Sequence, residues 1–167
     1  MKTFSNILII GMGLIGSSIA RALKKNDNTI KVFGVDNNLK VINKCENLKI
    51  VNDCKSKIIE FSEQFDLIII CSPLSTYKGI FSVLNDYVSK ETLMTDVGST
   101  KVSVINDFKE ICTNNKIKFV PSHPIAGIEK SGPDSGFAEL FENRYCILTP
   151  TNKDEYFVSL IKTLWES

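Results

Sequence analysis

Residues 6–16 are Asn6-Ile7-Leu8-Ile9-Ile10-Gly11-Met12-Gly13-Leu14-Ile15-Gly16, a short apolar run that leads directly into three spaced glycines. A run of this kind predicts a buried strand, and the glycine spacing is typical of the turn that joins such a strand to a dinucleotide-binding helix. Gly11 allows the tight turn, Gly13 lets the backbone approach a pyrophosphate, and Gly16 lets the helix pack closely on the strand. The free amides at the helix start would face the phosphates. This stretch therefore predicts a nucleotide-binding α/β fold.

Asp36 stands at the end of the second expected strand, twenty residues after Gly16. A carboxylate in this place accepts hydrogen bonds from the ribose hydroxyls of the adenosine and repels a 2′-phosphate. Residues 37–40 contain no arginine that would favour the phosphate. The sequence thus predicts NAD rather than NADP as the cofactor. The competing interpretation is a glycine turn beside a surface aspartate.

Short apolar runs alternate with segments of helical period along the rest of the chain. Such alternation predicts a Rossmann-type, doubly wound α/β fold, with a mainly parallel sheet and helices on both faces. We expect strands over residues 6–10, 30–35, 49–51, 66–71, 92–96, 118–121 and 145–148. We expect helices over residues 14–25, from the end of the second strand through 45, and over 55–61, 77–88, 101–112 and 153–167.

The composition is that of one soluble domain of 167 residues, covering positions 1–167. A net charge of +1 gives no electrostatic reason to expect a nucleic acid or a membrane surface as partner. The five cysteines are scattered and form no C-x-x-C pair, which argues for reduced thiols in the cytoplasm and against a metal site or a disulfide framework.

Three loops should meet at the reactive end of the cofactor, because ligands of a doubly wound sheet lie beyond the carboxyl ends of its strands. The first holds Ser72, Pro73 and Thr76, where either hydroxyl could bind the cofactor and Thr76 could instead cap the next helix. The second holds Ser99, which could lie beside the nicotinamide or cap the following helix. The third holds His123, the one histidine of the chain. Histidine is the side chain that exchanges a proton near neutral pH, so His123 is a candidate base.

These residues resemble the prephenate and arogenate dehydrogenases of tyrosine biosynthesis. The resemblance depends on the glycine turn with Asp36, on the Asp-Val-Gly-Ser-Thr-Lys run at 96–101, and above all on the His-Pro-Ile-Ala-Gly run at 123–132. It implies that His123 is the catalytic base, that Ser99 bonds both this histidine and the substrate hydroxyl, and that Glu129 guards the substrate entrance. Ile128 departs from the family, in which many members carry a polar residue there. The cofactor-binding residues are expected to be Gly11, Met12, Gly13, Leu14, Ile15, Gly16, Asp36, Ser72, Pro73, Thr76 and Ser99.

The reaction that the resemblance implies is the NAD-dependent oxidative decarboxylation of prephenate to 4-hydroxyphenylpyruvate, with arogenate as the alternative substrate. The rate should fall at low pH as His123 takes up a proton. The family's substrate-binding arginine and its dimer contacts lie in a helical domain that follows this one. Neither Arg21 nor Arg144 is well placed to replace that arginine. We therefore expect this chain to be the amino-terminal portion of a homodimeric enzyme, or an unusually short relative, that turns over little or no prephenate on its own.

An apolar stripe near the carboxyl end fits this expectation, because its residues recur at helical spacing up to Trp165. It indicates either a last helix that packs on the sheet or a helix that leads into a further domain. Two other functions stay open: a β-hydroxyacid dehydrogenase with the same nucleotide domain, and a non-catalytic NAD-binding or redox-sensing module.

Overall fold

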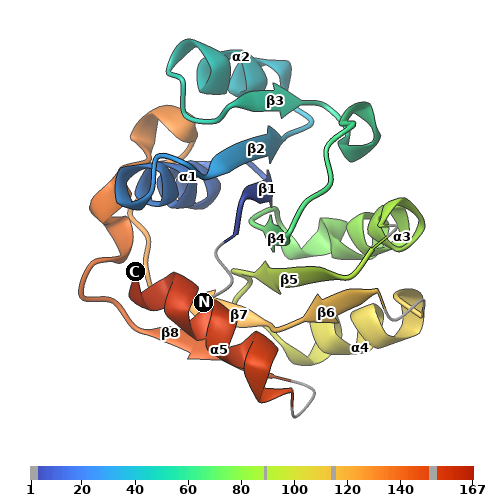
Figure 1. Cartoon of the computed structure of the whole chain (residues 1–167). Helices are drawn as coiled ribbons and strands as arrows, with labels where there is room; N and C mark the ends of the chain where they lie inside the picture. The colour runs from blue at the N-terminus through green and yellow to red at the C-terminus, as the bar shows by residue number, and fades with distance from the viewer. Residues whose placement is uncertain (1–3, 89, 114–115, 151–153) are drawn as a thin grey trace.

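The computed structural model describes residues 4–88, 90–113, 116–150 and 154–167. A parallel sheet of six strands forms its centre, in the order β3-β2-β1-β4-β5-β6 (Figure 1). The strands are β1 (Asn6–Ile10), β2 (Lys31–Val35), β3 (Asp53–Lys55), β4 (Leu67–Ile70), β5 (Thr92–Asp96) and β6 (Ile117–Phe119). The predicted Rossmann-type, doubly wound fold is confirmed.

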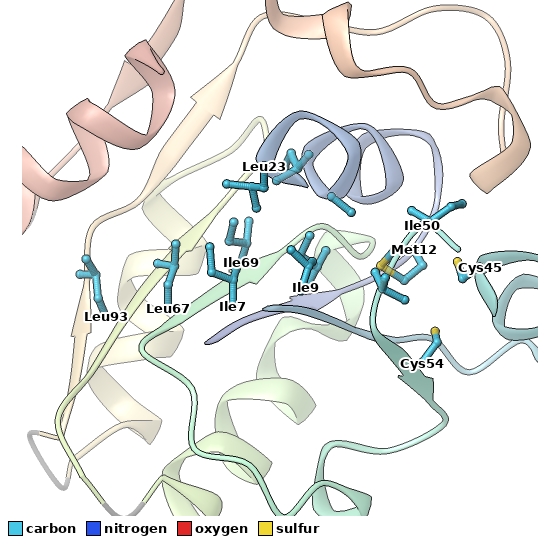
Figure 2. Packing of buried hydrophobic residues seen from close by; sticks show 14 of the residues in the cluster. Ile7, Ile9, Met12, Leu23, Cys45, Ile50, Cys54, Leu67, Ile69 and Leu93 are labelled. Atoms are coloured by element: carbon cyan, nitrogen blue, oxygen red, sulfur yellow. The ribbon is translucent and has the colours of Figure 1, made fainter. Parts of the chain in front are cut away.

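Helices cover both faces of the sheet, as Figure 1 shows. They are α1 (Leu14–Asn26), α2 (Leu39–Asn47), α3 (Tyr77–Tyr87), α4 (Val102–Ile111) and α5 (Glu155–Glu166). On one face, β1 and β4 pack their Ile7, Ile9 and Ile69 side chains against α1 (Figure 2). The helix α5 joins this cluster through Ile161. On the other face, α3 and α4 pack on the alternate side chains of the same strands. The strands are continuously apolar because both of their faces are buried.

The chain reverses its direction of winding between β1 and β4, since β2 lies on one side of β1 and β4 on the other. In doubly wound sheets the ligand-binding crevice lies at such a switch point, beyond the carboxyl ends of the strands. The glycine turn follows β1 at this point, so the fold places the candidate cofactor loop at the crevice.

The third strand and the helix after it were predicted wrongly. Residues 49–51 belong to the turn that ends α2: Ile50 N still donates to Cys45 O at 2.9 Å, and Lys49 has a positive φ of 51°. The strand comes later, at Asp53–Lys55, and the predicted helix over 55–61 is a single 3₁₀ turn, η1 (Ile58–Glu60). Ile50 and Val51 are buried as a strand's residues would be, which is why an apolar pattern cannot distinguish the two.

His123 lies in a strand and not in an open loop. Residues Ser122–Pro124 form β7, which pairs antiparallel with β8 (Cys146–Leu148) in a separate two-stranded ribbon. His123 is opposite Ile147 in this ribbon. The strand predicted at 145–148 exists, but it belongs to this ribbon and not to the parallel sheet.

The segment after β7 is attached to α1 by several polar contacts. It contains two 3₁₀ turns, η3 (Pro133–Ser135) and η4 (Ala138–Phe141). Arg21 Nη1 donates to Pro133 O at 3.0 Å, and Phe137 N donates to Ser18 Oγ at 3.1 Å. Lys25 and Glu139 form an exposed ion pair at 2.6 Å. The segment that follows His123 is thus fixed on the helix that begins at the glycine turn.

The apolar stripe near the carboxyl end packs on the core, as one of its two interpretations predicted. Leu160 and Ile161 are buried, and Trp165 packs edge-on against Phe141 with ring centroids 5.5 Å apart. The predicted start of this helix at 153 lies outside the described residues. None of the helices in the described ranges has the length and hydropathy that a membrane crossing needs.

Candidate functional site

Of the three glycines in the turn after β1, only one has room for a side chain. Gly11 has a φ of +97°, and a Cβ on it would lie 2.6 Å from Ser72 N. A Cβ on Gly16 would collide with Gly11 O. A Cβ on Gly13, by contrast, would meet nothing within 4 Å. Gly11 and Gly16 are therefore required by the fold itself, whereas Gly13 borders open space that a ligand can enter.

The start of α1 faces that open space. Gly13 is the residue before the helix, and no side chain caps the free backbone amides of its first turn. Leu14 and Ile15 are half-buried, so their amides can reach a ligand while their side chains pack. The Met12 side chain is fully buried, which leaves only its backbone to contribute to the cofactor site. This arrangement suits an anion such as a pyrophosphate.

Asp36 lies where the sequence predicts it, directly after β2 and beside the glycine turn. Its Oδ2 accepts from Met12 N at 3.0 Å, and its Oδ1 accepts from Asn38 N at 2.9 Å. These two bonds fix the carboxylate at the crevice. Next to it lies an apolar cavity of about 330 Å³, lined by Ile10, Val35, Lys57, Ile58, Ile59, Thr76, Gly79, Ile80, Val83 and Leu84. Its size and apolar walls suit a flat heterocycle.

The loop after β4 brings two of the predicted hydroxyls together. Ser72 Oγ and Thr76 Oγ1 are 2.8 Å apart, and Thr76 Oγ1 donates to Pro73 O at 2.7 Å. Thr76 precedes α3, but its side chain makes no capping bond, so the alternative role as a helix cap is wrong. Ser99 also fails to cap: the residue before α4 is Lys101, and no side-chain cap is formed there.

Asp96 ends β5 and is fully buried. Its Oδ2 accepts from Lys101 Nζ at 2.7 Å, from Gly98 N at 3.0 Å and from Tyr77 Oη at 3.2 Å. Burial lowers the pKa of Lys101, and the nearby Asp96 charge opposes that effect. Burial, together with the same charge, raises the pKa of the Tyr77 hydroxyl, which therefore stays protonated and donates. This network holds the loop that carries Ser99.

His123 lies over the end of β5, half-buried, with its Nδ1 3.3 Å from Val97 O. A carbonyl oxygen can only accept, so Nδ1 carries the proton in this contact and Nε2 of the neutral ring has a free lone pair. Ser99 follows Val97 by two residues and is exposed, and no hydrogen bond of its hydroxyl is formed among the described residues. The fold thus brings two residues of the predicted catalytic set, Ser99 and His123, to the carboxyl end of one strand.

One further predicted residue, Glu129, is placed less tightly, and Arg144, which was not predicted to lie near the site, is close to His123. Glu129 is exposed, in the segment between β7 and η3. Arg144 borders an open hollow that it shares with residues 123–127, although its position in the sequence gave no reason to place it near His123. Arg21 contacts the backbone of η3 and does not reach this hollow.

Asp96, Lys101 and Tyr77 were not selected from the sequence as site residues. One signal was present: an aspartate that ends an otherwise uncharged, buried strand needs a partner, and a lysine follows it by five residues. Tyr77 gave no such signal, because its hydroxyl reaches Asp96 only through the packing of α3 on the sheet.

Known proteins resemble the chain over nearly its whole length. The family described as "Prephenate dehydrogenase, nucleotide-binding domain" matches residues 19–167. Cyclohexadienyl dehydrogenase of Zymomonas mobilis is 36% identical over 167 residues, which cover 99% of this chain and 56% of that protein. Prephenate dehydrogenase of Lactococcus lactis is 35% identical over 149 residues, which cover 89% of this chain and 42% of that protein.

A solved structure agrees with these matches. The prephenate dehydrogenase from A. aeolicus, in complex with hydroxyphenyl propionate and NAD+, superposes with a TM-score of 0.89 at 34% sequence identity. The superposition covers 99% of this chain and 57% of that one. The chain therefore spans about half the length of the relatives that it matches.

Proposed function

Because this chain belongs to the family of prephenate dehydrogenase nucleotide-binding domains, we propose that it forms, as one domain over residues 1–167, the NAD-binding part of an enzyme that oxidatively decarboxylates prephenate to 4-hydroxyphenylpyruvate. The observation that carries the proposal is the placement of His123. Its ring lies at the carboxyl end of β5, with Nδ1 3.3 Å from Val97 O, which leaves Nε2 free to accept a proton. A histidine buried among aliphatic side chains, or at the other end of the sheet, would have opposed it.

The residues around the crevice fit NAD. The α1 amides and the open space at Gly13 would hold the pyrophosphate, and Asp36 would accept from the ribose hydroxyls. The apolar cavity beside Val35 would take the adenine. Ser72, Pro73, Thr76 and Ser99 would border the nicotinamide half. When bound, the nicotinamide accepts the two electrons and the hydrogen that leave the substrate.

His123 and Ser99 would act on the substrate hydroxyl. The neutral imidazole accepts the hydroxyl proton at Nε2, while the Nδ1 contact to Val97 O keeps the ring in the required tautomer. Ser99 orients the hydroxyl toward the ring, and Glu129 controls access to the pocket. Loss of carbon dioxide makes the ring aromatic, which supplies the driving force, so the protein mainly has to align the reactants.

Arogenate is the second candidate substrate, because a relative of this chain carries the broader name cyclohexadienyl dehydrogenase. Both compounds carry carboxylates, for which a bidentate arginine is the usual partner. We assign the arginine that binds the substrate carboxylate, and the contacts of a homodimer, to the helical domain that follows this one in the family. The compartment that we propose is the cytoplasm, in agreement with five free thiols.

A chimera tests the proposal directly. Residues 1–167 would replace the matching half of the Zymomonas mobilis relative, and reduction of NAD would be followed with prephenate and with arogenate. We expect turnover of at least one of them by the chimera and none by residues 1–167 alone. Tight NAD binding without any turnover in the chimera would instead support a non-catalytic module.

Asp36 sets the cofactor preference in a testable way. Replacement by serine removes the carboxylate that accepts from the ribose and repels a 2′-phosphate. We expect affinity for NAD to fall about tenfold, the equivalent of one lost charge-assisted hydrogen bond, while affinity for NADP rises or stays constant. Titration calorimetry with both nucleotides measures the ratio. An unchanged ratio would show that Asp36 does not contact the ribose.

The thiols test the redox-sensing alternative, because a sensor thiol needs an exposed thiolate. Burial raises the pKa of Cys146 to about 11 and that of Cys112 to about 12, and it also raises the pKa of Cys71. A hydrogen bond with Cys54 lowers the pKa of Cys45, but Cys45 is fully buried and out of reach of a reagent. At pH 8 about a thousandth of Cys146 is thiolate. We expect slow alkylation of the native chain by iodoacetamide at pH 8, faster alkylation as the pH approaches 11, and complete alkylation in urea. Rapid modification of one native thiol at pH 7 would favour the sensor.

A further inference from the structure

Asp96 forms hydrogen bonds with two segments that lie far apart in the sequence, the loop after β5 and the strand β7. Its Oδ2 holds the loop after β5, through Gly98 N. Its Oδ1 accepts from Ser122 N at 3.2 Å, and its backbone oxygen accepts from Ser122 Oγ at 2.6 Å. Ser122 directly precedes His123. One fully buried residue therefore contacts both the loop of Ser99 and the strand of His123.

The bonds to Asp96 help to hold strand β7 over the sheet, together with Trp165 Nε1 of α5, which donates to Ser122 Oγ at 3.2 Å. It has three residues and pairs only with β8, which itself lies outside the six-stranded sheet. Ser122 Oγ also lies 2.9 Å from Thr95 Oγ1 of β5. Apart from the contact of His123 with Val97 O, the polar contacts between β7 and the β5 end all pass through Ser122.

We propose that Asp96 is the positioning residue of this site: its two carboxylate oxygens hold Gly98 and Ser122, and thereby fix Ser99 and His123 relative to each other. The inference rests on the function proposed above, in which those two residues act on one hydroxyl group. Asp96 itself is too deeply buried to touch a substrate, so it acts through the loop that carries Ser99 and the strand that carries His123.

A carboxylate is the group that this task needs, since four donors converge on its two oxygens. An asparagine of the same shape has one oxygen and an NH₂ group, which can only donate. In Asp96→Asn, either Gly98 N or Ser122 N would then face an NH₂ group, which is a donor, in place of the carboxylate oxygen that accepted from it. Burial of an unpaired carboxylate is unfavourable, and Lys101 at 2.7 Å supplies the compensating charge.

Asp66 offers a matched control. Its Oδ2 likewise accepts from two backbone amides, Ser5 N at 3.0 Å and Asn6 N at 3.1 Å. These amides lie at the amino ends of the strands, at the edge of the sheet opposite His123. Because both amides share one oxygen, an asparagine at position 66 can keep them, so Asp66→Asn controls for the loss of a carboxylate charge without touching the site.

The experiment uses the nitrogen resonances of His123, which are unambiguous because the chain has one histidine. In the ¹⁵N-labelled parent without an added tag, we expect the Nδ1–H tautomer to predominate when the ring is neutral. In Asp96→Asn we expect that tautomer to lose its predominance, and in Asp66→Asn we expect it to persist. Tyr77→Phe, which removes one donor to Asp96 without changing the packing, should shift the tautomer ratio in the same direction as Asp96→Asn and by less. If Asp96→Asn does not fold, the tautomer ratio of Tyr77→Phe still tests the inference.

Unchanged tautomer ratios in folded Asp96→Asn or in Tyr77→Phe would overturn the inference, and so would an equal change in Asp66→Asn, which would reveal a general loss of stability. The measurement needs no cofactor. A parent chain that binds no NAD would contradict the proposed function, whereas the tautomer comparison would still decide the role of Asp96.

Discussion

Replacement of Gly13 by alanine should abolish most NAD binding and leave the fold intact. A Cβ at this position meets no protein atom within 4 Å, so the free energy of unfolding should change by less than about 1 kcal/mol. The same methyl group would occupy the space where a pyrophosphate approaches the α1 amides. The loss of one or two charge-assisted hydrogen bonds there corresponds to about a hundredfold weaker affinity.

Two other glycines make the comparison specific. Gly16→Ala should destabilise the chain, because its Cβ would collide with Gly11 O. Gly127→Ala also adds a methyl group that meets nothing within 4 Å, but it does so in the hollow that His123 borders and not at the α1 amides, so it should leave the pyrophosphate contacts intact and weaken NAD binding less than Gly13→Ala does. Thermal unfolding and NAD titration of the three variants give the result. A Gly13→Ala chain with parental NAD affinity would mean that the phosphates bind elsewhere.

Replacement of His123 by alanine or asparagine should reduce turnover by about 10²–10⁴-fold in the chimeric enzyme. The reason is that, among the described side chains at the end of β5, only His123 offers a neutral nitrogen that can accept a proton, since the indole of Trp165 only donates there. Affinity for NAD should change by less than a few-fold, because the proposed pyrophosphate and adenosine contacts lie on β1, β2, α1, η1 and α3 and not on β7. Steady-state rates with saturating NAD and substrate measure the effect.

The asparagine variant serves as the control for shape, since its amide can still donate to Val97 O. If asparagine restored nearly full turnover, proton abstraction by His123 would be excluded. Turnover that fell together with the free energy of unfolding would point to damage of the β7–β8 ribbon instead, so both quantities need to be measured on each variant.

The central fold was predictable because its signals are local. The apolar run of β1, the glycine turn and the carboxylate after β2 are all short-range patterns, and the structure places them as predicted. The resemblance carried by residues 96–101 and 123–132 likewise located the two loops that meet at the end of β5.

Other parts were not predictable because they depend on tertiary contacts. The strand assigned to 49–51 has the burial of a strand but the backbone of a turn. The strand around His123 is three residues long and exists only through pairing with residues more than twenty positions away. The buried bonds of Asp96 join β5, α3 and β7, which no periodicity in the sequence connects.

The attachment of η3 and η4 to α1 has a consequence for how such a site can diversify. Residues 125–131 form a bridge whose two ends are both secured, one by the ribbon and the other by Arg21 and Ser18. Most residues along the bridge, including Ile128 and Glu129, are exposed. In the enzyme proposed above, substitutions at the exposed positions would change which substrates enter the site at little cost to the free energy of unfolding.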